Sequence, residues 1–202
     1  MSKVKICGLS RTEDIHAVNL ALPDFIGFVF AKSHRQVVES KAMTLKKQLD
    51  SRIEAVGVFV NQEIEYVERL YRKGIIDLVQ LHGDEDEQYI RRLKEICGCP
   101  VIKTISIGST FPKLPKNADY FLFDTLSHQR GGTGKSFDWS VLKNYDGTPY
   151  FLAGGLNITN VCSALHLLAP FCIDVSSGVE TNGIKNAEKI HRFVCLVRGE
   201  NR

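Results

Sequence analysis

Short apolar runs, rich in β-branched and aromatic residues, recur at fairly regular intervals along the chain. Several are almost continuously apolar, which is typical of parallel strands that are covered on both faces. The pattern predicts eight strands, at residues 4–7, 25–30, 55–60, 77–81, 101–105, 120–123, 150–152 and 172–175.

Helical patterns separate these runs, with apolar residues spaced three, four and seven positions apart. The first pattern lies behind Ser10 and Glu13, whose spacing predicts a capping box, and the third follows Asn61, a predicted N-cap. Gly98 is expected to end the fourth helix. The fifth interval, residues 106–116, contains two prolines and predicts a loop.

The alternation of strands and helices predicts an α/β fold, and eight similar units favour a closed (β/α)8 TIM barrel with a weak or missing fifth helix. An open doubly wound sheet shows the same alternation and is the alternative that the pattern leaves open. Residues 7–11, after the first strand, lack the glycine fingerprint of a dinucleotide-binding sheet. No linker divides the chain, so residues 1–202 are expected to form one catalytic domain.

Composition narrows the function classes. The chain has 202 residues, of which 44% are hydrophobic, and a formal net charge of +3. The basic residues are scattered, which indicates no nucleic-acid partner. No apolar run is long enough to span a membrane, and the first residues predict a strand rather than a signal peptide. We therefore expect a cytoplasmic protein whose six cysteines are reduced thiols.

Polar residues and glycines follow the predicted strands at the point where each strand ends. In a barrel, the carboxyl ends of all strands meet at one rim, and active sites lie there. The residues that we expect at this rim are Cys7, the segment 32–35, Asn61, Gln80, His82, Asp124, Gly154, Gly155 and the segment 176–178.

Two loops with small residues predict a phosphate site. Gly154 and Gly155 follow the seventh strand, and Ser177 and Gly178 follow the eighth. Small residues let backbone N–H groups approach an anion closely, and these two loops are the usual phosphate position in barrels. The alternative is that the turns are tight and need glycine for that reason alone.

A glycine-rich stretch at residues 131–136 ends in Gly-Lys-Ser. It is not a nucleotide-binding P-loop, because Gln129 stands where that motif requires glycine. We expect instead a glycine-rich loop near the active site.

Three side chains at the rim are candidates for chemistry. Cys7 is a base or nucleophile as a thiolate, or else a buried packing residue. Asp124 is a carboxyl that a dry site keeps protonated as an acid, or else a helix cap or ion-pair partner. Arg35 can clamp a carboxylate with two parallel hydrogen bonds, or else lies on the surface. The spacing of His34, His82 and Asp124 matches no metal motif, so no metal ion is expected.

Seven blocks, in order along nearly the whole chain, resemble phosphoribosylanthranilate isomerases. The first is Lys-Ile-Cys-Gly-Leu-Ser-Arg at residues 5–11, and the last is Asp-Val-Ser-Ser-Gly-Val-Glu at residues 174–180. The others lie at residues 56–61, 79–85, 123–125, 131–139 and 152–157.

The resemblance implies a cofactor-independent barrel enzyme of tryptophan biosynthesis. The implied reaction is the Amadori rearrangement of N-(5-phosphoribosyl)anthranilate to 1-(2-carboxyphenylamino)-1-deoxyribulose 5-phosphate. It implies Cys7 as general base, Asp124 as general acid and Arg35 as the residue that holds the anthranilate carboxylate. The remaining residues expected from the match are the substrate contacts Gln80, His82 and Asp174 and the phosphate contacts Gly154, Gly155, Ser177 and Gly178.

Two details of these blocks bear on the chemistry. Ser33-His34-Arg35 stands where the family usually has Ser-Pro-Arg, which alters the rigidity of the loop that carries Arg35. A cysteine with an ordinary pKa is mostly a thiol at neutral pH, so Cys7 needs a neighbour that lowers its pKa. Lys5, two residues earlier on the same face of the strand, is expected to be that neighbour.

Two other functions remain open from the sequence. One is another phosphate-binding barrel, such as a metal-dependent pentose-phosphate epimerase or an indole-glycerol-phosphate synthase with Lys103 as its acid. The other is a barrel that binds a phosphorylated ligand without turning it over. The expected partner is a small phosphorylated aminosugar, with no nucleic acid and no membrane, and the chain is expected to be a monomer or a homodimer.

Overall fold

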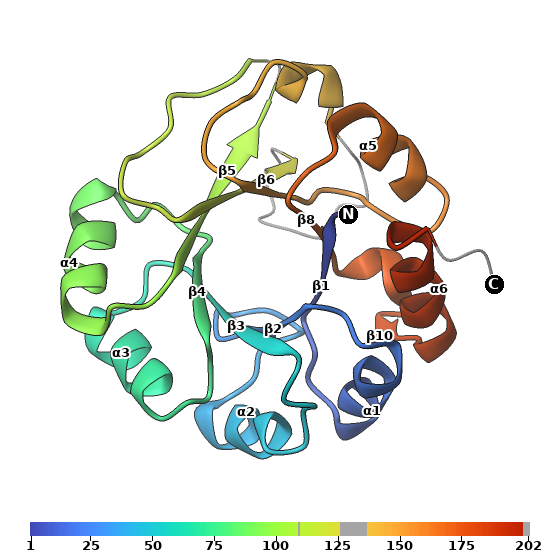
Figure 1. Ribbon diagram of the computed structural model, residues 1–202. Coiled ribbons are helices and arrows are strands. Elements are labelled where there is room, and N and C mark those ends of the chain that lie inside the picture. Colours follow the sequence, from blue (N-terminus) through green and yellow to red (C-terminus); the bar gives the residue numbers. More distant parts are fainter. Residues whose placement is uncertain (109, 126–136, 200–202) are drawn as a thin grey trace.

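Eight parallel strands close into a barrel in the computed structural model, which describes residues 1–108, 110–125 and 137–199. Each strand pairs with the next one in sequence, and the eighth pairs with the first, so the doubly wound alternative is excluded. Figure 1 looks along the barrel, with the strands in an inner ring. The strands are β1 (Lys3–Cys7), β2 (Phe25–Val29), β3 (Glu54–Phe59), β4 (Leu78–Leu81), β5 (Val101–Ile107), β6 (Tyr120–Thr125), β7 (Tyr150–Leu152) and β8 (Cys172–Val175).

Helices cover the outside of this ring (Figure 1). They are α1 (Thr12–Ala21), α2 (Glu39–Lys46), α3 (Ile64–Arg72), α4 (Glu87–Cys97), α5 (Val161–Leu168) and α6 (Ala187–Val197), with short 3₁₀ helices η1 (Trp139–Leu142) and η2 (Ser177–Val179). The described residues between β5 and β6 form no helix, which confirms the loop predicted from the two prolines. The glycine-rich stretch at residues 131–136 lies outside the described residues.

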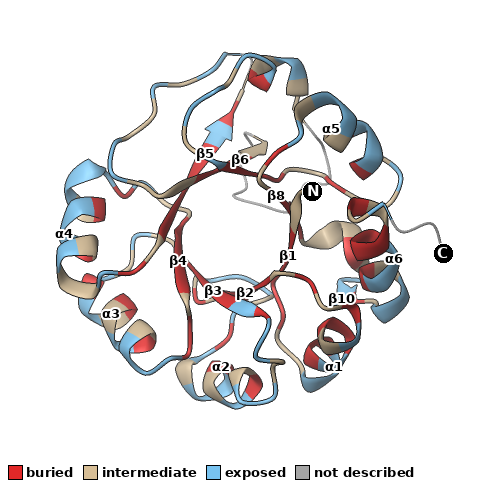
Figure 2. Cartoon of the chain, viewed as in Figure 1, coloured by how far each residue is buried: buried red, intermediate tan, exposed pale blue. Residues whose placement is uncertain are grey.

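The core has two layers on either side of the strands. Figure 2 shows buried residues along the strands and on the helix faces that meet them. Outward side chains of the strands pack against the helices in one large cluster. Inward side chains form a smaller cluster that fills the barrel: Phe25, Val56, Leu78, Ile102, Leu122, Phe151, Ala153 and Cys172.

The inward cluster decides which polar residues reach the rim. Side chains on a strand alternate between its two faces, so the inward position recurs every second residue. Leu122 faces inward and therefore places Asp124 inward, and Cys172 does the same for Asp174 on β8. Leu78 likewise places Gln80 inward. The apolar plug thus supports a layer of polar side chains at the carboxyl ends of the strands.

Two helix starts differ from the sequence prediction. Asp14, not Glu13, accepts the free backbone N–H groups before α1, from Ser10 and Arg11, at 3.0 Å each. The N-cap of α3 is Glu63 rather than Asn61, whose backbone is left-handed with φ 49°. Both errors place the cap one or two residues from its true position, because the local pattern does not decide which polar residue turns inward. Gly98 ends α4 in the left-handed conformation, as predicted.

A small antiparallel sheet was not predicted. It consists of β9 (Glu180–Thr181) and β10 (Ile184–Lys185) and follows η2 directly. Its turn, Asn182-Gly183, has positive φ at both residues, as a two-residue hairpin turn requires. The Asn-Gly pair was the signal available in the sequence. Across the described ranges, no helix combines the length and the apolar character needed to cross a bilayer.

Candidate active site

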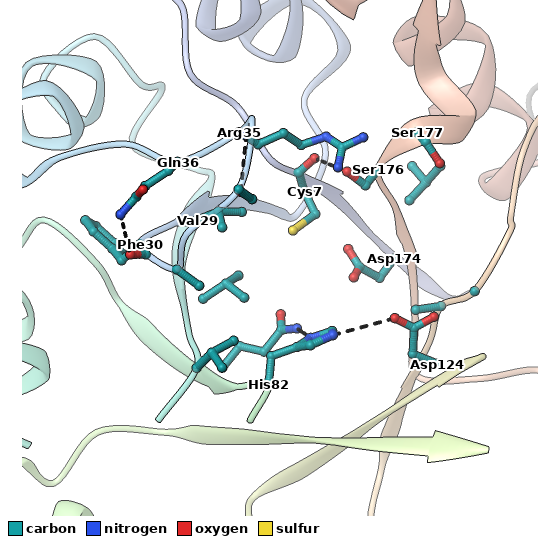
Figure 3. A pocket seen from close by; sticks show the side chains of 18 of the residues that line it. Cys7, Val29, Phe30, Arg35, Gln36, His82, Asp124, Asp174, Ser176 and Ser177 are labelled. Carbon is teal, nitrogen blue, oxygen red and sulfur yellow. Dashed lines mark hydrogen bonds and ion pairs between the residues drawn. The ribbon is translucent and has the colours of Figure 1, made fainter. Parts of the chain in front are cut away.

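A cavity of about 610 Å³ opens at the carboxyl ends of the strands. Figure 3 shows Cys7, Asp174, Asp124 and His82 around the same space. The predicted site residues that line it are Cys7, Arg35, Gln80, His82, Asp124, Gly154, Gly155, Asp174 and Ser177. Gly178 is the one predicted site residue that does not line it.

Cys7 lies at the end of β1 beside a buried ion pair. Lys5 is fully buried, and its Nζ lies 3.0 Å from Oδ1 of Asp174. Burial raises the pKa of the Cys7 thiol and outweighs the nearby cations Lys5 and Lys185, which lower it. The expected effect of Lys5 is therefore present but smaller than that of burial. A thiolate formed here is a stronger base than one in water, and it forms at higher pH.

Asp124 lies at the end of β6, with its side chain largely but not completely buried. Burial raises its pKa to about 6, although the backbone N–H of Thr125 donates to Oδ1 at 2.7 Å and acts in the opposite direction. The carboxylate of Asp174 adds to the upward shift. A carboxyl with this pKa exchanges its proton close to neutral pH, as a general acid must.

His82 connects Asp124 to a polar group inside the barrel. Its Nε2 lies 3.8 Å from Oδ2 of Asp124. On the other side of the ring, Nε2 of Gln80 donates to Nδ1 at 3.0 Å, and Oγ1 of Thr104 lies 3.1 Å from the same nitrogen. A donor at Nδ1 places the ring proton on Nε2 in the neutral imidazole. His82 therefore presents an N–H group on the side of Asp124 and the cavity (Figure 3).

Arg35 reaches the cavity from the loop after β2 and pairs with a residue that the sequence analysis did not assign. Its Nε and Nη2 donate to the two carboxylate oxygens of Glu180 at 2.8 and 2.9 Å. Lys185 donates to the same carboxylate at 2.6 Å. Both partners come from the unpredicted β9–β10 hairpin, so this contact could not be anticipated without the hairpin.

The glycines of the two rim loops serve close packing. A Cβ on Gly154 would lie 2.3 Å from Oγ1 of Thr125, and φ at Gly154 is 87°. A Cβ on Gly178 would lie 1.9 Å from the carbonyl oxygen of Leu156. The absence of a side chain at Gly178 therefore lets η2 pack closely against the loop after β7. Within the described ranges, no acceptor is found for the N–H groups of Gly155 and Ser177, which both line the cavity. Such groups are available to an anion.

Lys103, the acid that a synthase would need, is held away from the cavity. Its Nζ donates to the carbonyl of Gly83 and to Glu85, each at 2.8 Å, and its side chain is almost fully buried. It is absent from the cavity lining. Through these two hydrogen bonds, Lys103 connects β5 to the loop after β4.

Comparison with known proteins identifies the family of this chain. A family model described as N-(5′-phosphoribosyl)anthranilate (PRA) isomerase matches residues 4–195. The N-(5′-phosphoribosyl)anthranilate isomerase of Endomicrobium trichonymphae is 48% identical over 199 residues, which cover 98% of this chain and 99% of that protein. The crystal structure of phosphoribosyl anthranilate isomerase from Thermotoga maritima is 35% identical with a TM-score of 0.86, covering 98% of this chain and 100% of that one.

A further solved structure is similar over the same length. It is a phosphoribosyl anthranilate isomerase in complex with reduced 1-(o-carboxyphenylamino)-1-deoxyribulose 5-phosphate. It is 32% identical with a TM-score of 0.83, and the match covers 98% of this chain and 100% of that one.

Proposed function

The chain belongs to the N-(5′-phosphoribosyl)anthranilate isomerase family, and we propose that it performs the family's reaction with Cys7 as general base and Asp124 as general acid. It is an isomerase of tryptophan biosynthesis that converts N-(5-phosphoribosyl)anthranilate to 1-(2-carboxyphenylamino)-1-deoxyribulose 5-phosphate. The observation that carries the proposed roles is that a buried thiol and a carboxyl with a pKa of about 6 line one cavity.

The acid acts first in the proposed sequence. Protonated Asp124 donates to the ring oxygen of the ribose, the C1–O bond breaks, and a cationic imine forms between C1 and the anthranilate nitrogen. Burial of Asp124 favours this step, because it keeps a share of the carboxyl protonated near neutral pH.

The base acts on the imine. The positive charge at nitrogen makes the proton at C2 acidic, and the Cys7 thiolate removes it to give an enolamine. The enolamine then tautomerises to the ketone: the hydroxyl group on C2 loses its proton, and C1 gains a proton. The substrate has then gained two protons and lost two, so the product has the same composition. One acid and one base suffice for these proton transfers, and we propose that they proceed without a cofactor.

The phosphate and the carboxylate lie at opposite ends of the substrate, so the cavity must bind each of them at a different side. The N–H groups of Gly155 and Ser177 support a phosphate site between the loops after β7 and β8. Arg35 is the proposed partner of the carboxylate, with Gln80, His82 and Asp174 around the sugar between them. Holding both ends places C2 beside the base, which is a large part of the rate enhancement in such reactions.

Turnover tests the proposed function directly. Purified protein is expected to consume N-(5-phosphoribosyl)anthranilate, followed by loss of its fluorescence, with equimolar formation of the ketose and no change on adding a chelator. Binding of the substrate without turnover would support the alternative of a non-enzymatic barrel.

Because the substrate carries two anionic groups that do not enter a bilayer unaided, we propose that the reaction takes place in the cytoplasm.

The phosphate loops give a second prediction, for Gly178→Ala. The added Cβ would lie 1.9 Å from the Leu156 carbonyl oxygen, so η2 must move by more than 1 Å. We expect kcat/KM to fall about 10²-fold and inhibition by inorganic phosphate to weaken.

Gly98→Ala is the matched control for Gly178→Ala. It also adds one methyl group to a glycine, at the end of α4, where no atom lies within 4 Å of the new Cβ. Because φ at Gly98 is 64°, alanine is strained there, and the variant therefore controls for backbone strain away from the cavity. It should leave inhibition by phosphate unchanged. Equal inhibition of wild type and Gly178→Ala would contradict the proposed phosphate site.

A further inference from the structure

The β9–β10 hairpin places two charged side chains against the active-site rim. Glu180 and Lys185 lie opposite each other in its register, and both side chains are almost completely buried. The hairpin follows η2, so it continues directly from the loop of the proposed phosphate site. None of the proposed catalytic steps uses either residue.

The carboxylate of Glu180 is bound by three charge-assisted hydrogen bonds. Nε and Nη2 of Arg35 donate to its two oxygens at 2.8 and 2.9 Å, and Nζ of Lys185 donates at 2.6 Å. Burial alone would raise the pKa of Glu180, but these bonds outweigh it and lower the pKa to about 2. Glu180 is therefore ionised throughout the physiological range, and its pair with Arg35 keeps both charges there.

The stem of Arg35 is fixed as well. A Cβ on Gly8 would lie 2.4 Å from Cδ of Arg35, so the arginine crosses the backbone at a point where only glycine fits. Figure 3 shows Arg35 extending from its loop across to Cys7 and Ser176. Arg35 is thus held by its stem at Gly8 and by one edge of its guanidinium at Glu180.

The other edge of the guanidinium remains for a ligand. A bidentate pair through Nε and Nη2 leaves Nη1 and one N–H of Nη2, and within the described ranges Nη1 donates to no residue. Arg35 lines the cavity. The two cations and one anion of this cluster leave a net positive charge, which attracts a second carboxylate.

We propose that Glu180, supported by Lys185, is a positioning residue that orients Arg35 and thereby makes the site selective for an aromatic substrate with a carboxylate. The inference rests on the proposed function, in which Arg35 meets the anthranilate carboxylate. A guanidinium that is already oriented loses little conformational freedom when it binds, and its free edge fits a carboxylate with two parallel bonds. The hairpin, although it takes no part in the proposed proton transfers, then contributes to substrate choice.

The experiment compares two substrates on Glu180→Gln. One is N-(5-phosphoribosyl)anthranilate, and the other is the same compound built on aniline, which lacks the carboxylate. For the carboxylate substrate we expect KM to rise about 10- to 100-fold, since an uncharged amide cannot hold both guanidinium nitrogens. We expect kcat to change little, and KM for the aniline substrate to stay as in wild type. Product is measured by chromatography for both substrates.

Two further variants complete the design. Glu188→Gln makes the same chemical change at an exposed position of α6 and should alter neither KM. Glu180→Asp keeps the charge on a side chain shorter by one methylene and should restore part of the selectivity, which also provides a test if Glu180→Gln folds poorly.

The outcomes test two claims separately: that Arg35 binds the carboxylate of the substrate, and that Glu180 positions Arg35. If wild type has the same KM for both substrates, the proposed role of Arg35 is wrong, whatever Glu180 does. If wild type is selective but Glu180→Gln keeps its KM for the carboxylate substrate, or binds that substrate more tightly, Glu180 does not position Arg35. A loss of equal size with both substrates would show a structural role only and would also overturn the inference.

Discussion

Replacing Cys7 with alanine is expected to lower kcat by about 10²–10⁴-fold, because the proposed base, which removes the proton from C2, is lost. The neighbouring carboxylate of Asp174 does not replace it, since it is paired with the buried Lys5 at 3.0 Å. KM should change little, because the proposed phosphate and carboxylate anchors lie on other loops. The measurement is kcat and KM for N-(5-phosphoribosyl)anthranilate near neutral pH.

A second cysteine provides the control. Cys162 is exposed on α5, so Cys162→Ala removes a thiol by the same chemical change outside the cavity. Its kcat should equal that of wild type. If Cys7→Ala kept kcat within a factor of ten of wild type, another group would have to be the base.

Asp124→Asn is expected to lower kcat by a similar factor, about 10²–10⁴-fold, and also to change the pH dependence. Asparagine keeps the size of the side chain but has no acidic proton to transfer, as the proposed role of Asp124 requires. The diagnostic measurement is kcat/KM as a function of pH, which reports the ionisation of the free enzyme.

The expected wild-type profile follows from the two pKa values. In the proposed mechanism the active form has a proton on Asp124 and none on Cys7, whereas the pKa of Asp124 is about 6 and that of Cys7 is raised. At a pH between these two pKa values, Asp124 and Cys7 together hold one proton. Most molecules carry it on Cys7, and a small fraction, which does not change with pH, carries it on Asp124. kcat/KM should therefore be level there. Below about pH 6 it should fall tenfold per unit, because a second proton then blocks the base.

The variant should behave differently in the same range. Without Asp124, only the Cys7 thiol titrates, so the residual kcat/KM of Asp124→Asn should rise tenfold per pH unit from pH 6 upward, until the raised pKa of Cys7 is reached. Asp146→Asn, at an exposed position, should keep the wild-type profile. A profile of Asp124→Asn that is still level above pH 6 would show that the lower limb belongs to another group.

The positions of the eight barrel strands could be predicted from the sequence because they are local patterns. Eight apolar runs occur in the chain, and eight strands occur at those places, with ends displaced by at most two residues. The inward direction of Asp124 and of Gln80 also follows from strand periodicity, once the apolar plug is known. The loops with small residues after β7 and β8 could likewise be recognised, because each is a short contiguous segment.

Helix caps were less predictable, because several polar residues near a helix start compete for the same backbone groups. Asp14 caps α1 in place of the expected Ser10–Glu13 pair because its carboxylate turns back toward the N–H groups of Ser10 and Arg11. Asn61 forms a left-handed turn rather than an N-cap, since its N–H is taken by Glu85 at 2.7 Å. The conformation of Asn61 thus depends on a contact with a residue 24 positions away in the sequence.

The sequence by itself determined the positions of the eight barrel strands, the polar residues at their ends and the residue types available for acid–base chemistry. Only the tertiary structure decided that the sheet closes, that Arg35 pairs with Glu180 at a separation of 145 residues, and that Lys5 pairs with Asp174 at a separation of 169. It also decided that burial, rather than Lys5, governs the pKa of Cys7. The physical reason is that strand and helix patterns depend on neighbours along the chain, whereas desolvation and ion pairing depend on neighbours in space.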